Sequence, residues 1–397
     1  MKRLCFFFLL LAGCSLHLKA QQIPEGYFTS EGAAVALGDD IIVSIKKYNP
    51  TAEEIANAMK PPKNAPMNYL QIPAEATSLS LYDKGFESMI YCLNKTGTIK
   101  WNKTIGYSNK SVASPLKEYK GFLYTGESVK EDDKVVIQKM DASGNIIWQT
   151  TMDSLHDVNA IYVEDDIVNA LVSFEGSEKV TGPDGKFSYH NWPVYFFMAL
   201  DIKTGKVISK EYQMMGNYLS KLGFLNPVIN TGSSYYLNNA DSAIFFNVAN
   251  QRGATVVSEN MSTDNKILKL TAGTESNHYL TLLSQSKNKK VYTVISDFYG
   301  EKKKKYQSEL PVPYFRSIAR YHIYKNDGDS ILSIIQAGPS INITYTDIEG
   351  KSSLYKNIED APAPVVAAAI LPGKLCLVQV EGRDKQGQSG KMKLSFY

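Results

Sequence analysis

Short polar turns that end in glycine recur along this 397-residue chain at nearly regular intervals. In each, an apolar run leads into Asn, Asp, Thr or Ser, a glycine follows, and a second run leaves the turn. Four of the five intervals between these glycines are 47, 48, 47 and 50 residues, and the remaining one is 61. The glycines are Gly97, Gly144, Gly205, Gly253, Gly300 and Gly350. Such a period indicates that one supersecondary unit is repeated along most of the chain.

Each period holds several strand-like segments separated by polar turns. Residues 121–152 contain, in order, GFLYTGESV, KEDDK, VVIQKMD, SGN and IIWQTTM, which alternate as strand, turn, strand, turn and strand. Glycine supplies the positive φ that tight hairpins need. Four antiparallel strands in about 48 residues are typical of a β-propeller blade. The sequence therefore predicts an all-β fold, a seven-bladed β-propeller of four-stranded antiparallel blades.

The C-terminus predicts how this ring closes. One further period after Gly350 ends at Tyr397, the last residue, so the last blade lacks one strand. Residues 29–37 (TSEGAAVAL) are placed to supply it. We therefore expect the last blade to be closed by an N-terminal strand, which leaves only short sheet edges.

The turn ALDIKTGKVI carries a family resemblance. It resembles the repeat of the pyrroloquinoline-quinone-type (PQQ-like) propellers, whose signature is A-x-D-x-x-T-G-x-x-x-W. Ile208 stands where that signature has tryptophan, and segments 94–101 and 141–148 keep both the glycine and the tryptophan. The matching positions are Ala199, Asp201, Thr204 and Gly205.

The resemblance implies a non-enzymatic branch of that family. The adjacent cysteines, stacking tryptophan and calcium-binding acidic cluster of the quinone enzymes cannot be placed in this sequence, so we expect no cofactor and no metal. Trp101 and Trp148 occupy a fixed position of the repeat, where we expect them to pack between blades.

The first 20 residues predict export. Lys2 and Arg3 precede a short apolar stretch, as in a signal peptide. Cleavage after Ala20 would release one soluble domain, residues 21–397, whereas a lipobox ending at Cys14 would give a lipid-anchored protein. Both alternatives place the protein in the periplasm, at the outer membrane or outside the cell.

Charge and cysteine content limit the partners. Removal of the leader takes away three positive charges and lowers the formal net charge from +3 to zero, so we expect no nucleic-acid partner and no membrane contact beyond a lipid anchor at Cys14. Cys92 and Cys376 remain in apolar contexts, and they form either one disulfide bridge or two buried thiols.

Two long connections hold the candidate binding residues. Residues 175–192 are expected to form a long loop between the second and third strands of a blade, and residues 213–227 a long connection to the next blade. Exposed aromatic residues on such loops favour binding, although the same loop could fold over and bury them. The candidates are Phe187, Tyr189, His190, Trp192, Met215 and Tyr218.

The sequence thus predicts an exported binding or scaffold protein for an envelope or extracellular protein or a glycan, without catalysis. The alternative is a glycan-active hydrolase or lyase whose site lies at the central channel, because propeller enzymes collect active-site residues from separate blades. Residues 50–66, which contain an Ala-rich stretch ended by two prolines, are expected to form a surface insertion.

Overall fold

A computed structural model of the chain describes its first half more continuously than its second half. In the described parts all regular secondary structure is β-strand, and no helix there has the length and apolar character needed to cross a membrane. The leader, Cys14 and the insertion at 50–66 lie outside the described residues. The described residues are 23–48, 86–108, 113–129, 134–155, 157–164, 166–213, 226–231, 234–238, 243–247, 255–257, 265–272, 279–286, 291–297, 303–307, 319–325, 331–337, 339–346, 352–361, 363–381 and 390–397.

Five of the sheets are four-stranded antiparallel meanders whose strands follow chain order. One contains β5 (Leu116–Tyr119), β6 (Phe122–Val129), β7 (Lys134–Met140) and β8 (Ile146–Asp153). The next contains β9 (Asp157–Glu164), β10 (Ile167–Thr181), β11 (Phe187–Asp201) and β12 (Val207–Gln213). In β8 exposed side chains alternate with buried or half-buried ones from Ile147 onward, as in a half-buried strand, whereas β6 and β7 are buried along most of their length and on both faces.

The other three meanders lie in the second half of the chain. The first has β13 (Asn226–Thr231), β14 (Ser234–Asn238), β15 (Ala243–Asn247) and β16 (Thr255–Val257). The second has β17 (Asn265–Ala272), β18 (Tyr279–Ser286), β19 (Val291–Asp297) and β20 (Lys303–Gln307). The third has β21 (Ala319–Lys325), β22 (Ile331–Ala337), β23 (Ser340–Thr346) and β24 (Ser352–Ile358).

A seven-stranded sheet joins the two ends of the chain. Its order is β25 (Val365–Leu371), β26 (Lys374–Glu381), β27 (Gly390–Phe396), β1 (Glu25–Leu37), β2 (Asp40–Tyr48), β3 (Phe86–Leu93) and β4 (Ile99–Ser108). The N-terminal strand therefore lies beside the C-terminal one.

The residues of β1 that pair with β27 differ from those that the sequence predicted. Glu25 and Gly26 form the ladder with β27, whereas β1 from Tyr27 onward pairs with β2. The register of β1 against β2 shifts between Phe28 and Gly32, so one long strand leaves the first ladder and continues in the second. The expectation that residues 29–37 pair with the last strand is wrong, because their apolar part is used to build the sheet of β2.

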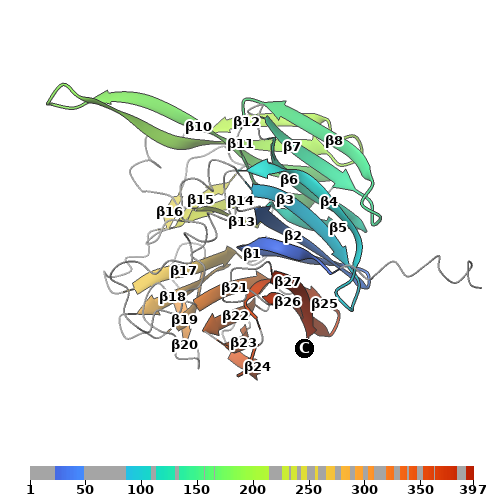
Figure 1. The fold of residues 1–397 in the computed structure, drawn as a ribbon. Helices are drawn as coiled ribbons and strands as arrows, with labels where there is room; N and C mark the ends of the chain where they lie inside the picture. The colour runs from blue at the N-terminus through green and yellow to red at the C-terminus, as the bar shows by residue number, and fades with distance from the viewer. Residues whose placement is uncertain are drawn as a thin grey trace, which may run out of the picture.

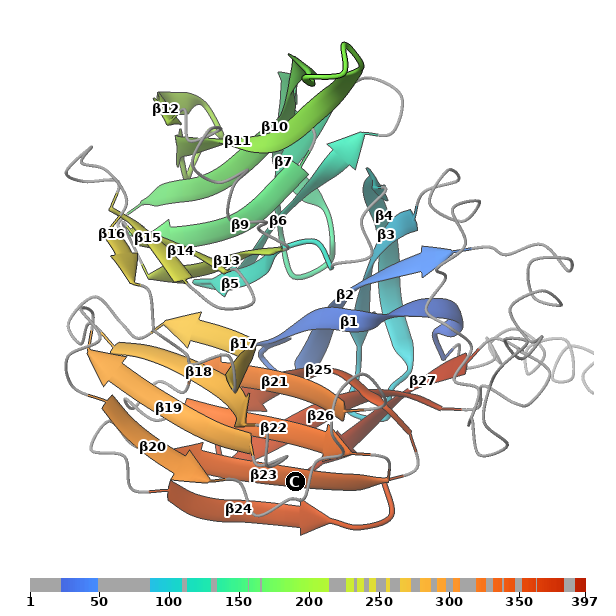
Figure 2. The same ribbon diagram turned by 90° about the vertical axis from the view of Figure 1, so that its left-hand side faces the viewer.

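The first strands of successive sheets lie next to one another (Figure 2). Contacts link β1 to β5, β5 to β9, β9 to β13, β13 to β17, β17 to β21 and β21 to β25. β25 also contacts β1, which belongs to the same seven-stranded sheet.

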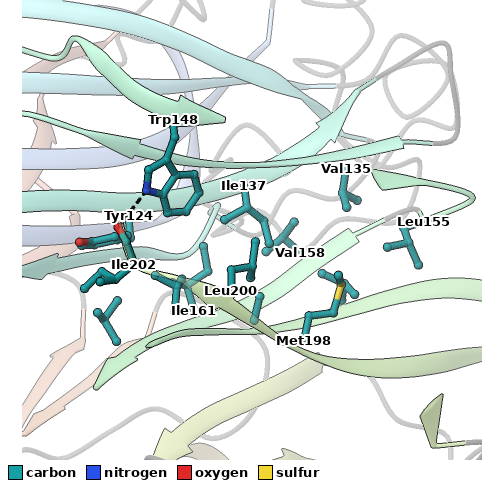
Figure 3. Packing of buried hydrophobic residues seen from close by; sticks show 14 residues of the cluster. Tyr124, Val135, Ile137, Trp148, Leu155, Val158, Ile161, Met198, Leu200 and Ile202 are labelled. Carbon is teal, nitrogen blue, oxygen red and sulfur yellow. Dashed lines mark hydrogen bonds between the residues drawn. The ribbon is translucent and has the colours of Figure 1, made fainter. Parts of the chain in front are cut away.

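The core consists of apolar layers between neighbouring sheets. Figure 3 shows the layer between the sheets β5–β8 and β9–β12, in which Tyr124, Ile137 and Trp148 of the first face Ile161 and Leu200 of the second. All five are at least nine-tenths buried. Because each of these two sheets covers one face of the other, the apolar residues of this layer are shielded from water.

Both described cysteines are buried thiols. Cys92 lies in β3 and Cys376 in β26, and neither forms a disulfide. Burial raises the pKa of Cys92 to about 12, with a further contribution from Asp40, and burial alone raises the pKa of Cys376 to about 12. Of the two alternatives that the sequence left open, the structure has the unbridged one.

Candidate functional site

The hairpin of β10 and β11 is much longer than the sheet to which it belongs. The two strands pair from Ile167 with Asp201 to Thr181 with Phe187. β9 accompanies β10 only to Ser173, and β12 reaches β11 no further than Tyr195. The remaining part, residues 175–193, is a two-stranded ribbon that projects from the sheets (Figure 1). We call residues 175–193 the arm.

The arm replaces the loop that the sequence predicted for residues 175–192. Only residues 182–186 form the turn, whose backbone is closed by hydrogen bonds from Gly185 N to Gly182 O (3.0 Å) and from Gly182 N to Lys186 O (2.7 Å). Gly185 has a φ of +76°, and Asp184 Oδ1 accepts a hydrogen bond from Lys186 N. The segment does connect the second and third strands, but most of it is strand and not the long loop that we expected: the Asp-Gly turn signal at 184–185 favours a hairpin.

One face of the arm carries exposed aromatic side chains. The cross-strand pairs Lys179–Tyr189 and Thr181–Phe187 share this face. Phe187 is 59% exposed and Tyr189 63%, and their rings meet edge to face with 6.1 Å between centroids. Lys179 Nζ lies 4.0 Å from the centroid of Phe187. We call Lys179, Thr181, Phe187 and Tyr189 the aromatic face; its two rings are not buried by the arm itself.

The other candidate residues do not join this surface. The register pairs Glu178 with His190 and Gly176 with Trp192, and these positions alternate with the aromatic face along both strands. Since successive residues of a strand belong to opposite faces, the four candidates of β11 are divided between two faces. Met215 and Tyr218, with the rest of residues 214–225, lie outside the described residues.

The base of the arm is anchored in the core. Val168, Ala170 and Val172 of β10 and Met198 of β11 are buried in the layer shown in Figure 3. The same two strands are thus fixed at one end by apolar packing and exposed at the other. Such a ribbon presents its aromatic face in a defined direction at a distance from the main body.

Tryptophans dock the fourth strand of one sheet, β4 or β8, onto the turn between the third and fourth strands of the next sheet. Trp148 Nε1 donates a hydrogen bond to the carbonyl of Ile202 at 3.0 Å, and Trp101 Nε1 donates one to Ala142 at 3.0 Å. Each ring packs on the turn glycine, Gly205 or Gly144. The predicted packing of both tryptophans between repeats is confirmed.

The described glycine turns of the repeat, including the two that receive these tryptophans, have the backbone that the sequence predicted. The φ angles of Gly97, Gly144 and Gly205 are +81°, +79° and +69°, while the three later glycines lie outside the described residues. A hydrogen bond from the Thr204 hydroxyl, with backbone hydrogen bonds from Thr204 and Lys203, lowers the pKa of Asp201. Ile208, at the position of the missing tryptophan, is 58% exposed.

A buried ion pair, which the sequence analysis missed, lies between the sheets β1–β4 and β5–β8. Lys46 Nζ is 3.0 Å from Glu127 Oε2, and both side chains are at least 95% buried. Ser88 and Ser114 donate hydroxyl hydrogen bonds to the same oxygen, and Ser128 N donates to Oε1 at 2.8 Å. We call Lys46, Ser88, Ser114, Glu127 and Ser128 the ionic clasp.

The electrostatics of the ionic clasp indicate a structural role. Burial by itself raises the pKa of Glu127, but the Lys46 ammonium and hydrogen bonds from Ser114, Ser88 and the Ser128 backbone together hold that pKa below its ordinary value. The carboxylate is therefore ionised and fully hydrogen-bonded. Among the described residues no group of three or more His, Cys, Asp or Glu side chains could hold a metal ion.

Comparison with solved structures identifies the fold. The β-propeller domain of the Trilobed protease from Pyrococcus furiosus, which has an open Velcro topology, superposes with a TM-score of 0.51 over 94% of this chain and 97% of that domain, at 9% identity. The chain has a β-propeller fold. At this identity the likeness concerns architecture alone.

Two further similarities are weaker. Acylaminoacyl peptidase from Pyrococcus horikoshii gives a TM-score of 0.48 at 10% identity over 93% of this chain and 51% of that one. The uncharacterized protein lmo1340 from Listeria monocytogenes EGD-e gives 0.41 at 9% identity over 93% and 96% of the two chains. No protein-family model and no curated protein matches the sequence.

Proposed function

We propose that this chain is an exported β-propeller that binds a partner protein of the cell envelope or the extracellular space through the aromatic face of its arm. The observation that carries this proposal is the exposure of Phe187 and Tyr189 at the end of a ribbon whose base is anchored in the core. Large aromatic side chains at such positions are the residues that dominate binding energy in protein interfaces. The role is binding or scaffolding, without a chemical step.

We further infer a ring of seven four-stranded blades. The seven-stranded sheet divides into β25–β27 plus the start of β1, and the remainder of β1 with β2–β4. Added to the five meanders, these two units make seven. The contacts that run from β1 through each first strand to β25 and back to β1 support closure, with Glu25 and Gly26 as the closing strand.

The relation to the PQQ-like repeat remains our proposal as well. It is supported by the turn of Asp201, Thr204 and Gly205 and by the docking of Trp148 on that turn. Export rests on the leader sequence of residues 1–20, with a lipid anchor at Cys14 as the alternative to cleavage after Ala20.

A protein fits the aromatic face better than a glycan. Sugar rings stack on flat, accessible aromatic faces, but Phe187 and Tyr189 stand at 83° to each other. One face of Phe187 is in addition covered by Lys179 Nζ. Edge-to-face rings with a flanking ammonium are suited to an apolar pocket with an acidic rim on a protein surface.

Site-specific photo-crosslinking in intact cells tests this proposal. With Tyr189→p-benzoylphenylalanine we expect adducts between this chain and a partner protein, which a protease degrades. Adding Phe187→Ser should reduce the yield of these adducts about tenfold, because the substitution removes an aromatic ring that contributes strongly to binding. The control is Ile147→p-benzoylphenylalanine in β8, an exposed apolar position on the main body. Equal adduct yields at both positions, or adducts removed only by glycosidases, would contradict a protein partner of the arm.

A further inference from the structure

The N-terminal end of β1 sets a register on the outer edge of β27. Glu25 lies opposite Lys391, and Met392 N donates a hydrogen bond to the carbonyl of Pro24 at 2.8 Å. In an antiparallel ladder, each step toward the N-terminus on one strand is matched by a step toward the C-terminus on the other. This register therefore directs the residues that precede Pro24 along β27 beyond Met392, where the described part of the chain has no other strand.

The repeat shows what a fourth strand does at this place. In both tryptophan interfaces, a fourth-strand side chain donates a hydrogen bond to the carbonyl of the turn glycine of the next sheet. Lys103 Nζ lies 3.2 Å from Gly144 O, and Thr150 Oγ1 lies 2.6 Å from Gly205 O. Each donor is the second residue after the tryptophan of its strand. A lysine and a threonine both serve, so the contact needs a donor at this position and not one particular residue type.

The equivalent position of the last sheet lies opposite Leu394. The two donors pair with Ile90 and Ile137 of the third strands, and each of these isoleucines pairs with the fifth residue of the second strand of its sheet. In the last sheet the fifth residue of β26 pairs with Leu394. Leu394 packs against the apolar layer shared with the first sheet, and its side chain lies 3.9 Å from the place that a Cβ on Gly97 would take. A donor to the Gly97 carbonyl is therefore expected opposite Leu394.

We propose that Gln22 is this donor and that residues 21–24 complete the outer strand of the last sheet. Counted back from Pro24, the register places Gln22 opposite Leu394. Its side-chain amide is a hydrogen-bond donor, as the contact requires. Residues 21 and 22 lie outside the described part of the chain, so the placement rests on the register of β1 and on the repeat, which lead independently to the same residue.

The exposure of the neighbouring residues agrees with this placement. Ile23 is 45% exposed, and the register puts it opposite Lys393, which is exposed as well. Because successive residues of a strand point to opposite faces, Gln22 then belongs to the face of Leu394, toward the first sheet. Both alternatives for processing of the leader retain Gln22. The outer strand rests on the closed ring proposed above, and it does not depend on partner binding by the arm.

Cross-strand disulfides test the register in the exported full-length chain. Gln22→Cys/Leu394→Cys places two thiols opposite each other, and directly paired residues, about 5.5 Å apart at Cα, are within the range of a disulfide. We expect the disulfide in most molecules. Gln22→Cys/Lys393→Cys is the matched control, because Lys393 points to the other face, and its yield should be about tenfold lower. Glu25→Cys/Lys391→Cys lies in the described ladder and should form the disulfide in any case. Intact mass after thiol alkylation, with and without reduction, gives the three yields.

The three pairs separate this proposal from the closure of the ring. Equal yields for the two pairs that contain Gln22→Cys, beside a high yield in the described ladder, would overturn the outer strand of residues 21–24 and leave the closing ladder of β1 and β27 in place. Failure of all three pairs would overturn both. Photo-crosslinking through Tyr189 does not depend on either result, so the proposed partner binding is tested separately.

The hydrogen bond to Gly97 is tested by changing the donor at position 22. Gln22→Lys keeps a donor of the kind that Lys103 provides at Gly144, and should leave the urea midpoint of the mature chain unchanged. Gln22→Glu replaces the donor by a carboxylate that faces a carbonyl, and should lower the midpoint by about 0.3 M. Gln21→Glu, the matched control, makes the same charge change on the opposite face and should have no effect. Equal midpoints for Gln22→Glu and Gln21→Glu would overturn the assignment of Gln22 as the donor.

Discussion

The two interfaces that the sheet β5–β8 makes with its neighbours share one contact and differ in another. In both, a tryptophan packs on the turn glycine of the following sheet and donates a hydrogen bond to a turn carbonyl. The interface with β9–β12 is otherwise an apolar layer built around Ile137 and Leu200, into which Lys139 donates one buried hydrogen bond, from Nζ to the Ile202 carbonyl at 3.1 Å. The interface with β1–β4 has an apolar layer as well, but it also buries the ionic clasp of Lys46 and Glu127.

The difference shows which part of the repeat is fixed and which part varies. The tryptophan and the glycine set the distance and the angle between two sheets, and they recur. The layer behind them needs only to be fully packed and fully hydrogen-bonded, so apolar residues and a satisfied ion pair serve equally. The two interfaces should therefore respond in different ways to substitution and to pH.

The largest effect is expected in the ionic clasp. Glu127→Ala leaves the Lys46 ammonium buried without its carboxylate, which should lower the free energy of unfolding by about 3–5 kcal/mol. The control is the double variant Lys46→Met/Glu127→Leu, which removes both charges at similar volume; it should be more stable than Glu127→Ala, and the loss that remains comes from Ser88, Ser114 and the Ser128 N–H, whose acceptor is gone. Urea denaturation followed by tryptophan fluorescence measures both; a double variant as unstable as the single one would contradict this explanation.

A smaller effect is expected at the shared contact. Gly205 has a φ of +69°, and a Cβ there would lie 2.5 Å from the Trp148 ring, so Gly205→Ala combines backbone strain with a steric clash. We expect a loss of about 2–4 kcal/mol in the free energy of unfolding.

Gly185→Ala isolates the part of this loss that is due to the tryptophan. Gly185 in the turn of the arm has a φ of +76°, but no atom lies within 4 Å of its added Cβ. The Gly185→Ala variant should therefore lose only about 1–2 kcal/mol of unfolding free energy, which is due to backbone strain. The loss should be smaller still if the arm opens locally before the rest of the protein unfolds. The denaturation midpoints of both variants give the comparison, and equal losses at the two glycines would show that the tryptophan contact adds nothing.

The parts of the fold that were predictable from sequence are local and repeated. The turn glycines, with their positive φ, and the packing of Trp101 and Trp148 follow from a pattern that recurs every 47 to 61 residues. The residues of β1 that pair with β27 were misplaced, because a strand that serves two ladders in succession has no signature of its own in a single sequence.

Of the candidate site, the sequence pointed to the segment and to its two exposed rings, but its local structure was predicted wrongly. Its aromatic residues were found because they cluster in an unusually long repeat, yet the strand alternation through Phe187 and Tyr189 and the Asp-Gly turn were read as an irregular loop. The ionic clasp could not be found, because Lys46, Ser88, Ser114 and Glu127 come from distant segments that meet only after the sheets pack.

The effect that is smallest at neutral pH is acid sensitivity. It is specific to the interface with β1–β4, because that interface contains the ionic clasp. Lys46 and its hydrogen-bonding neighbours hold the pKa of Glu127 below the carboxyl value of the unfolded chain, despite the burial that raises it. The stabilisation is therefore complete above the unfolded pKa, near 4.5, and is lost as the pH falls through the folded pKa. Between about pH 6 and 8 no change is expected.

Other carboxylates with lowered pKa values, such as Asp141 and Asp201, titrate in the same acid range, so the total pH dependence does not isolate the clasp. The contribution of the clasp is isolated by the difference in pH dependence between the wild type and Lys46→Met/Glu127→Leu. Denaturation midpoints measured from pH 7 to pH 3 should fall more steeply for the wild type than for the double variant. Parallel curves would mean that Glu127 has the same proton affinity in the folded and unfolded chains, and the contrast between the two interfaces would then lie in packing alone.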